Sequence, residues 1–430
     1  MILKKMGISV INITFVSLGV FFSCEPDYSI DRSGLNYEDE TDVQALVIDT
    51  LPSSQPMKHV GALHTPADFE RIKSKLDADQ SPWVEAYALL ESNRHAQASY
   101  TPNPVEKLIR GGNSAEEPEP DNYGVAFNDA AAAYQLALRW KISGESQFAD
   151  SAINILNSWA SVNKEISGNS NVALAAGLYG YQFAIAGELL RDYEGWQAAD
   201  FEKYTTWLET VYLDLNMQFL ETHWGTCDTH YWANWDLANV LSVLAIGIVT
   251  DQRSVYNYGI NYLQNGDGNG NWYKAIYHVF DDEGLAQIQE SGRDQGHTLL
   301  CIGLMGHIAQ LTWNQGDDFY GLDDNRLFKA TEYVAKYNVA SLPVPFKDYT
   351  RKWGTNCVSE EYTEISDYGR GTARPIWSAP YYHYKNEKNL SPQYIELGVQ
   401  STTPEGGGGN YGGNSGGFDQ LGFGTLMYTR

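Results

Sequence analysis

Three stretches of the sequence hold polar residue types that a helical core does not need. They are HWGTCDTHYWANWD (223–236), GLAQIQESGRDQGHT (284–298) and RPIWSAPYYHY (374–384), and they contain four of the nine histidines. Imidazole and phenol groups transfer protons, whereas guanidinium and amide groups bind carboxylates. Proton transfer beside a bound anion is therefore the chemistry that these stretches suggest.

The second stretch carries a charged cluster at helical spacing. Glu290, Arg293, Asp294 and His297 follow one another at i, i+3, i+4 and i+7. On a helix, Arg293 and His297 would share a face, with Cβ atoms about 5–6 Å apart. A neighbouring guanidinium disfavours imidazolium, so we expect a neutral His297 available as a base, with Glu290 orienting Arg293. A solvated ion-pair cluster fits the same spacing, but the core-like run 299–304 favours a polar turn facing a cleft.

The first stretch places an amide between two indoles. Asn234 stands between Trp232 and Trp235, with Asp236 and Asn239 nearby. An amide that binds a carboxylate, flanked by rings that stack on a sugar, suits a carbohydrate site. N-capping of the following helix by Asn234 is equally consistent with the sequence.

The third stretch supplies phenols and an imidazole in an expected loop. Tyr381, Tyr382, His383 and Tyr384 are consecutive. Aromatic packing of an irregular extension would explain any one of them. We nevertheless keep Tyr382 and His383, together with Tyr231 of the first stretch, as candidates for proton transfer.

Other catalytic templates do not occur in the sequence. It contains no Walker A loop, no HExxH motif and no GxSxG motif. The segment NGDGNG (265–270) resembles a calcium loop, but its aspartate does not follow the DxDxDG spacing, so we expect a turn. We therefore predict no metal site and no cofactor.

The composition is acidic and aromatic. The formal net charge is −25, and Phe, Trp and Tyr make up 13% of the chain. So acidic a protein is a poor candidate for binding nucleic acid or an anionic membrane through its overall field. Amphipathic rings in this number suit stacking on sugars as well as core packing.

The N-terminus predicts export. Lys4 and Lys5 precede an apolar run, 8–22, that is short for a membrane span and typical of a signal peptide, 1–23. Ser23-Cys24 resembles a lipobox, so we expect lipidation of Cys24 rather than a plain secretory signal. An acidic tether, 24–60, would follow. We expect an exported protein anchored by lipid to the outer membrane, on its periplasmic or cell-surface face.

Three cysteines remain beyond Cys24, namely Cys227, Cys301 and Cys357. No CxxC or Cys/His spacing indicates a metal cage. At most one disulfide can form among three cysteines, and we expect three buried thiols instead.

Helical patterns joined by short turns occupy most of the chain. The main expected helices are 129–143, 146–162, 173–192, 198–221, 232–250, 252–264, 291–313 and 325–338. Consecutive helices with short links pack antiparallel, and no repeat of fixed length is visible, which favours a closed toroid of helical hairpins over a solenoid. We expect one domain, 61–430, ending in a loop-rich extension with a flexible glycine-rich segment, 405–417.

These residues carry a resemblance to a known family. HYWANWDLANV (230–240), TWNQGDDFYG (312–321), EYVAKYN (332–338) and the second and third stretches are similar to segments of the alginate lyase domain family. The likeness spans about residues 60–400 and is strongest to a Bacteroidetes lipoprotein branch. It implies an all-α fold, an (α/α) toroid of six to seven hairpins, and β-elimination on a polyuronate, with alginate as the expected substrate.

The resemblance also implies that Asn234 and Arg293 neutralise the substrate carboxylate. Donors at that carboxylate stabilise the enolate-like transition state when the weakly acidic C5 proton is removed. Better-known family members have Asn-His where this chain has Asn234-Trp235. The base therefore has to come from elsewhere in this chain.

A base must take the C5 proton and an acid must protonate the leaving O4. We assign His297 as base or proton relay and a tyrosine, Tyr382 or Tyr231, as acid or base, with His383 as a further candidate. Residues expected to contact the polysaccharide are Arg110, Trp232, Trp235, Gln287, Glu290, Gln295 and Arg374. We expect a monomer whose partner is an anionic polysaccharide.

Two other functions fit the sequence. A helical-toroid glycoside hydrolase acting on uronate-containing glycans needs two carboxyl groups across the bond, a pair that Asp236 with Glu290 or Asp294 would supply. A non-catalytic, lipid-anchored glycan-binding protein would need the aromatic residues but not Arg293.

Overall fold

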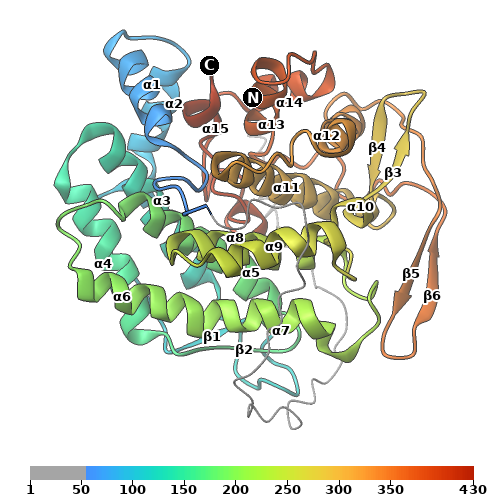
Figure 1. Cartoon of the computed structure of the whole chain (residues 1–430), viewed down its shortest axis with the longest axis horizontal. Coiled ribbons are helices and arrows are strands. Elements are labelled where there is room, and N and C mark those ends of the chain that lie inside the picture. Colours follow the sequence, from blue (N-terminus) through green and yellow to red (C-terminus); the bar gives the residue numbers. More distant parts are fainter. Residues whose placement is uncertain (1–54) are drawn as a thin grey trace, which may run out of the picture.

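The computed structural model describes residues 55–430; the predicted signal peptide, Cys24 and most of the predicted tether lie outside the described residues. The described chain is largely helical with three short two-stranded sheets, which confirms the all-α class (Figure 1). The longer helices are α1 (Pro66–Asp77), α2 (Trp83–Ser92), α3 (Gly124–Ser143), α4 (Ser146–Val162), α5 (Val172–Leu190), α6 (Ala198–Trp207), α7 (Asp214–Thr222), α8 (Ala233–Val249), α9 (Arg253–Asn265), α11 (Gln295–Gln315), α12 (Leu322–Asn338), α13 (Ser378–Asn386) and α14 (Tyr394–Thr402).

Shorter elements connect these helices. The short helices and turns are η1 (Arg94–Ala96), η2 (Leu208–Leu213), η3 (His223–Gly225), α10 (Trp272–Ala275), η4 (Gln289–Gly292), η5 (Ser415–Gly417) and α15 (Gly424–Tyr428). The strands are β1 (Lys107–Ile109), β2 (Glu165–Ser167), β3 (Ile276–Phe280), β4 (Leu285–Ile288), β5 (Tyr349–Trp353) and β6 (Val358–Tyr362). Only β1 and β2 pair in parallel; β3–β4 and β5–β6 are antiparallel hairpins.

The inner helices α5 and α8 run in the same direction in close contact. Gly177 of α5 lies against Ala238 of α8, and Gly180, one turn on, lies against Ser242. A Cβ on these glycines would lie 2.8 and 2.3 Å from atoms of α8, so only glycine permits this approach. Helices α3 and α11 share this direction, because their C-terminal ends lie beside the C-terminal ends of α5 and α8.

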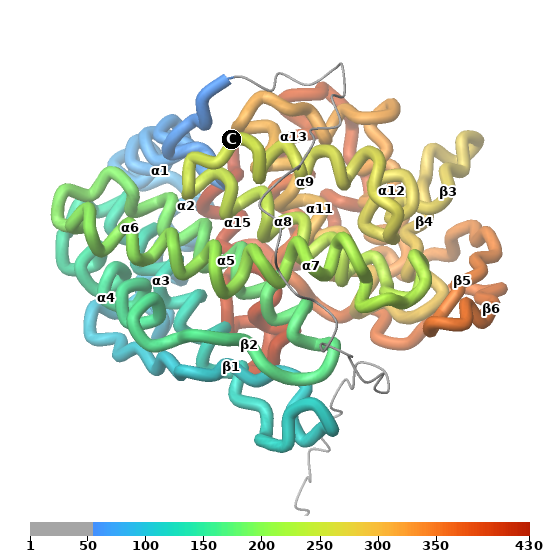
Figure 2. Tube along the Cα trace, turned by 60° about the horizontal axis from the view of Figure 1, so that its bottom comes forward, coloured from blue at the N-terminus to red at the C-terminus, as the bar shows by residue number. Residues whose placement is uncertain are grey.

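Outer helices return the chain antiparallel to the inner ones. Tyr256 of α9 lies against Gly247 of α8, whereas Gly259 lies against Leu244, further back along α8. The consecutive pairs α1–α2, α3–α4, α5 with α6–α7, α8–α9, α11–α12 and α13–α14 form the predicted (α/α) toroid (Figure 2). The helix expected at 198–221 is interrupted by the π-turn η2. No helix within residues 55–430 combines the length and apolar character needed to cross a membrane.

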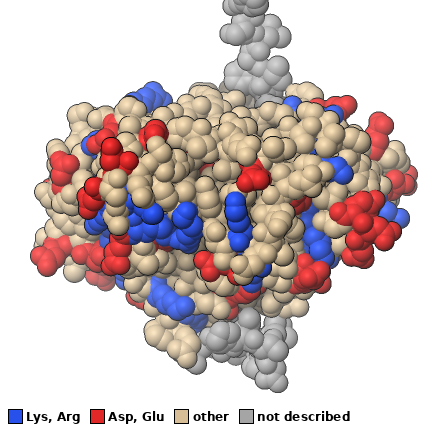
Figure 3. All heavy atoms as spheres, turned by 90° about the horizontal axis from the view of Figure 1, so that it is seen from above, with Lys and Arg blue, Asp and Glu red and all other residues tan. Residues whose placement is uncertain are grey.

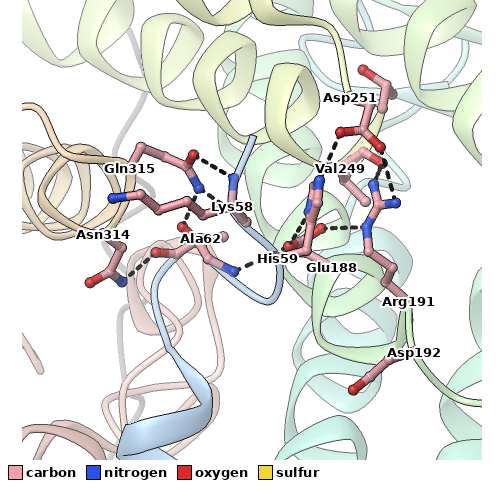
Figure 4. A network of polar contacts seen from close by, with 12 residues as sticks. Lys58, His59, Ala62, Glu188, Arg191, Asp192, Val249, Asp251, Asn314 and Gln315 are labelled. Carbon is pink, nitrogen blue, oxygen red and sulfur yellow. Dashed lines mark hydrogen bonds and ion pairs between the residues drawn. The ribbon is translucent and has the colours of Figure 1, made fainter. Parts of the chain in front are cut away.

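An N-terminal strap, residues 56–62, holds the C-terminal ends of three inner helices together (Figure 4). His59 bridges Glu188 of α5 and Asp251 after α8, with 2.8 Å from each ring nitrogen to a carboxylate oxygen. Gln315 of α11 accepts from the Lys58 backbone N–H at 3.0 Å and donates to the Gly61 carbonyl at 2.7 Å. This part of the predicted tether is therefore packed against the domain.

Both ends of the glycine-rich segment that was predicted to be flexible pack into the core, whereas residues 409–416 between them are exposed or partly exposed. Residues 405–408 and 417–421 are buried. Phe418 stacks on Phe127 of α3 with ring centroids 4.4 Å apart, and its carbonyl accepts from Gln182 of α5. A Cβ on Gly407 would lie 2.1 Å from the Phe423 ring. The glycines therefore provide room for close packing in the core.

A disulfide joins two segments that are distant in sequence. Cys227, in the loop before α8, is bonded to Cys357, in the turn of the β5–β6 hairpin, and Cys301 is a buried free thiol. The expectation of three thiols is therefore wrong. The two cysteines are 130 residues apart and no local pattern relates them, so their pairing depends on how the toroid brings the loop and the hairpin together.

Candidate active site

The candidate site lies at the N-terminal ends of the inner helices, opposite the strap. Arg110 precedes α3, Asn169 precedes α5, Trp232 precedes α8 and Asp294 is the N-cap of α11. The N-terminus of a helix carries a partial positive charge of about half an elementary charge. Parallel inner helices therefore direct several such partial charges toward one end of the toroid, which favours an anionic ligand there.

Glu290 joins Asn234 and Arg293. Its Oε1 accepts from the Asn234 backbone N–H at 2.7 Å and from the Asn234 side-chain amide at 2.8 Å, while Oε2 lies 3.0 Å from Nη1 of Arg293. The Cys301 thiol also donates to Oε1, at 3.2 Å. Glu290 is fully buried, so it positions the other two groups and does not contact a ligand itself. Glu290 thus pairs with Arg293, as its spacing suggested, whereas N-capping by Asn234 is not observed.

His297 is paired with the carboxylate of Asp294. Nδ1 of His297 lies 2.6 Å from Oδ2 of Asp294, whose Oδ1 accepts the His297 backbone N–H. This contact assigns the proton of the neutral ring to Nδ1, which leaves Nε2 as the basic nitrogen. Burial raises the pKa of Asp294, but hydrogen bonding and the charge of His297 outweigh it and lower that pKa below its usual value. The sequence spacing suggested Arg293 as the neighbour that controls His297, whereas the direct contact is with Asp294.

The Trp232 ring contacts two guanidinium groups. The Cζ atoms of Arg293 and Arg351 lie 5.1 and 4.6 Å from its ring centroid. Arg351 is held by the His230 carbonyl, at 2.8 Å from Nε, and by Glu360. The ring of Tyr362 packs edge-on against Trp232 at 5.2 Å. The buried indole therefore positions both cations and has no exposed face for a sugar.

Tyr231 is largely buried beside this group. Its ring packs against Phe219 and Trp235 at 4.9 and 4.8 Å. Burial raises the pKa of the Tyr231 phenol, although a hydrogen bond with Ser170 and the charge of Arg351 lower it in part. Tyr231 directly precedes Trp232, the N-cap of α8, so its ring lies near the N-terminal end of that helix.

Arg110 lies at the α3–α5 side of the same end. Its guanidinium stacks on Tyr123 at 4.9 Å and donates to the Tyr179 hydroxyl at 3.0 Å. Arg374, by contrast, binds Asp419 and Gln420 of the buried C-terminal segment, both at 3.1 Å. Arg110 is thus placed near the helix N-termini, whereas Arg374 supports the core.

Several residues predicted to contact polysaccharide have structural partners instead. Gln287 makes two hydrogen bonds with the Lys347 backbone, and Gln295 bonds the carbonyls of Ser291 and Ser366. Trp235 is buried behind Tyr231. Their amides and indole satisfy the buried backbone and fill the core, as polar and aromatic residues commonly do.

Tyr382 and His383 lie in another part of the molecule. They line a cavity with Trp313 and Asn314, which belong to the C-terminal end of α11. The helical rise places Trp313 roughly 27 Å from Gln295 at the start of α11. The structure therefore does not bring Tyr382 or His383 together with Arg293.

The carboxyl pair needed for a hydrolase is not available. Asp236 is fully buried and accepts from Tyr262 and the Gly270 backbone, with His223 3.1 Å away. Glu290 is fully buried and is bonded to Asn234 and Arg293. The NGDGNG segment is the turn that covers Asp236, as expected. Within residues 55–430, no group of three or more His, Cys, Asp or Glu side chains is arranged to hold a metal ion.

The sequence reasoning missed Arg351 and Tyr362, which belong to the β5–β6 hairpin. In the segment YTRKW, Tyr349 and Arg351 are buried while the residues between and after them are exposed or partly so. That alternation is the usual signal of a half-buried strand. The sequence alone could therefore have predicted this strand. Nothing local to the segment indicated that the strand packs against Trp232.

Comparisons with known proteins agree on the fold. An alginate lyase from Bacteroides ovatus shares 13% identity over 86% of this chain and 100% of its own, with a TM-score of 0.56. Alginate lyase A1-III from Sphingomonas species A1 shares 16% identity over 89% and 99%, with a TM-score of 0.59. A Tyr-to-Phe variant of A1-III complexed with a tetrasaccharide shares 15% identity over 89% of this chain and 99% of its own, with a TM-score of 0.58.

Sequence comparisons add the family. No curated protein matches the chain significantly. The family model described as alginate lyase matches residues 71–346, which include Asn234, Glu290, Arg293 and His297. By this match over more than half of its length, the chain belongs to the alginate lyase family.

Proposed function

We propose that the protein is a polysaccharide lyase that cleaves alginate, or a closely related polyuronate, by β-elimination. The observation that carries this proposal is the contact set around Glu290, which holds the Asn234 amide and the Arg293 guanidinium next to the His297–Asp294 pair. Family membership supports the reaction class. The tetrasaccharide complex of the A1-III variant supports an oligosaccharide ligand at a toroid of this kind.

In the proposed reaction, Arg293 and Asn234 bind the carboxylate of the uronate. Their charge and N–H donors stabilise the negative charge that develops when C5 loses its proton. His297 accepts this proton on Nε2, because Asp294 holds the proton on Nδ1. The C5 electron pair forms the C4–C5 double bond as the C4–O4 bond breaks, and Tyr231 donates its phenolic proton to O4.

The assignment of Tyr231 as the acid follows from its environment. Burial raises its pKa, so the phenol keeps its proton at neutral pH and can donate it. Tyr231 directly precedes Trp232, whose ring contacts the Arg293 guanidinium, so the phenol lies at the same end of the toroid as Arg293. Tyr382 and His383 are not proposed for this role, because they line a cavity at the opposite end of α11.

Incubation with a panel of polyuronates tests the reaction. Polymannuronate, polyguluronate, polyglucuronate and polygalacturonate are compared by ultraviolet absorbance of the unsaturated product, and product size shows whether cleavage is internal or terminal. Reducing ends without the ultraviolet signal would instead support a hydrolase, and binding without either would support a glycan-binding protein.

We also propose that the chain is an exported lipoprotein that works as a monomer outside the cytoplasm. The lipobox-like Ser23-Cys24 and the preceding apolar run support export. The Cys227–Cys357 disulfide supports an oxidising compartment, since such bonds are rare in the reducing cytosol. Fatty-acid labelling of the wild-type chain and of Cys24→Ala tests the anchor, and labelling that persists in the variant would reject it.

A further inference from the structure

A cavity lies at the opposite end of the inner helices from the candidate active site. Its volume is about 500 Å³, within the range of about 300–1,000 Å³ typical of small-ligand pockets. Its lining includes Thr65 and Arg71 of the N-terminal hairpin, Trp313 of α11, Tyr382 and His383 of α13, and Arg430. Figure 3 views the molecule from this side, where Lys and Arg side chains form a band despite the negative net charge.

The imidazole in this cavity is fixed in place but incompletely bonded. His383 is 6% exposed, stacks on Tyr320 with centroids 3.6 Å apart and meets Trp313 edge-on at 4.7 Å. Its Nε2 is buried and has no hydrogen-bond partner among residues 55–430. Burial lowers the pKa of His383 to about 3, so the ring is neutral at ordinary pH. The neutral, rigid imidazole of His383 therefore forms part of the cavity wall, where a polar ligand group can bond it.

The cavity also contains cations and an exposed indole. Arg71 and Arg430 share one carboxylate, Asp68, with Nη1 to Oδ1 distances of 2.7 and 3.1 Å. These two guanidinium groups are the cations of the lining, which also includes the carboxylates of Asp68 and Glu387. Trp313 is 37% exposed, which is unusual for an indole. Arginines, an indole and a neutral imidazole together match the carboxylate, the apolar face and the hydroxyls of an acidic sugar.

We propose that this cavity is a second, non-catalytic binding site for a uronate unit of the polysaccharide. The carboxylate lies against Arg71 and Arg430, the sugar ring lies against Trp313, and a hydroxyl bonds the imidazole of His383. The identity of the sugar rests on the proposed function, whereas the site itself rests on the cavity. Because the site is roughly 27 Å from the active site along α11, it holds a different stretch of polymer and raises the local concentration of substrate.

Calorimetric titration counts the binding sites. The full chain carrying Arg293→Ala, which cannot consume the ligand, is titrated separately with tetramannuronate, tetraguluronate and tetragalacturonate. In this background, Trp313→Ala is expected to remove one binding site per chain for at least one of them. The matched control is Tyr273→Ala, which alters a similarly exposed ring outside the cavity (41% exposed) and should leave the stoichiometry unchanged. His383→Phe, which keeps the stacking, should weaken the second site at least several-fold without altering the fold.

The outcomes separate this inference from the proposed function. Unchanged stoichiometry and affinity in both Trp313→Ala and His383→Phe, for every tetrasaccharide, would overturn the second site even if the wild-type chain is an active lyase. Trp313-dependent binding in a chain that yields no unsaturated product would support the site while rejecting the lyase reaction. Circular dichroism of each variant verifies that lost binding does not reflect unfolding.

Discussion

The carboxylate of Glu290 binds Asn234 twice, through the backbone N–H at 2.7 Å and the side-chain amide at 2.8 Å. Because Oε2 of the same carboxylate pairs with Arg293, one buried group sets the distance between the start of α8 and the turn before α11. The two groups proposed to neutralise the substrate are therefore positioned by a residue that does not contact it.

Replacing Arg293 should remove most of the activity. We expect Arg293→Ala to lower kcat at least about 10²–10³-fold, because the variant lacks the charge that stabilises the enolate-like transition state. The rate of ultraviolet absorbance increase on the best polyuronate measures the effect. Arg253→Ala, which alters an arginine near the strap, is the matched control and should behave as wild type. Full activity in Arg293→Ala would rule out the assigned site.

Replacing Glu290 should reduce both stability and activity. Glu290→Ala leaves the Arg293 charge without its buried partner, and breaking such a pair costs about 3–5 kcal/mol of unfolding free energy. Urea denaturation measures the loss of stability, and kcat measures the loss of activity. The control is Glu283→Ala, which alters an exposed glutamate and should change neither. Unchanged stability together with lost activity would instead show that Glu290 acts directly on the substrate.

Replacing Asp294 separates helix capping from catalysis. Asn is as good an N-cap as Asp, so Asp294→Asn should preserve the start of α11. It cannot hold the Nδ1 proton of His297 in the same way, and we expect kcat to fall by roughly 10²-fold or more. Steady-state kinetics as a function of pH measure this loss. A variant with normal kcat would exclude the His297–Asp294 pair from proton transfer.

The effect of Asp294→Asn on the unfolding free energy should also depend on pH. Burial raises the pKa of Asp294, but hydrogen bonding and the charge of His297 outweigh it and hold that pKa below the usual aspartate value of 3.8. A lowered pKa contributes stability that is present above the unfolded-state value and is lost as pH falls through the folded-state value. The free energy difference between wild type and Asp294→Asn should therefore shrink in acid. A difference that grows below pH 4 would contradict this linkage.

The strap should show the opposite pH dependence. A hydrogen bond to Glu188 is the main reason why the pKa of His59 is raised above 6.5, with burial acting against it. A raised pKa contributes stability that is fully present below 6.5 and is lost as pH rises through the folded-state value. His59→Gln should therefore be more destabilising at pH 6 than at pH 9, as thermal unfolding at both values would show. Equal effects at both pH values would exclude a charged His59 from the network.

Breaking the disulfide should weaken the fold around Trp232. Cys227→Ser frees the β5–β6 hairpin, whose Arg351 and Tyr362 pack on that indole. Disulfides typically contribute about 2–4 kcal/mol, and we expect a loss in that range together with reduced kcat. Urea denaturation and kcat, with and without reductant, measure both. Cys301→Ser alters the buried free thiol and should leave the sensitivity to reductant unchanged. Wild-type stability and activity in Cys227→Ser would contradict a structural role.

The sequence by itself determined the helical class, the main helices and the charged turn before α11. The helix expected at 146–162 is found there, because its turns and apolar periodicity are local signals. The spacing of Glu290 and Arg293 was likewise enough to predict their contact, since residues three apart on a helical turn are neighbours.

Only the tertiary structure decided which distant segments share a site. Tyr382 and His383 looked catalytic by residue type, yet the inner helices place them at the far end of α11. Arg351 and Cys357 looked unremarkable, yet the hairpin carries them to the loop before α8. Residue type and local spacing limit the chemistry of each segment, whereas the packing of parallel inner helices determines which segments face one another.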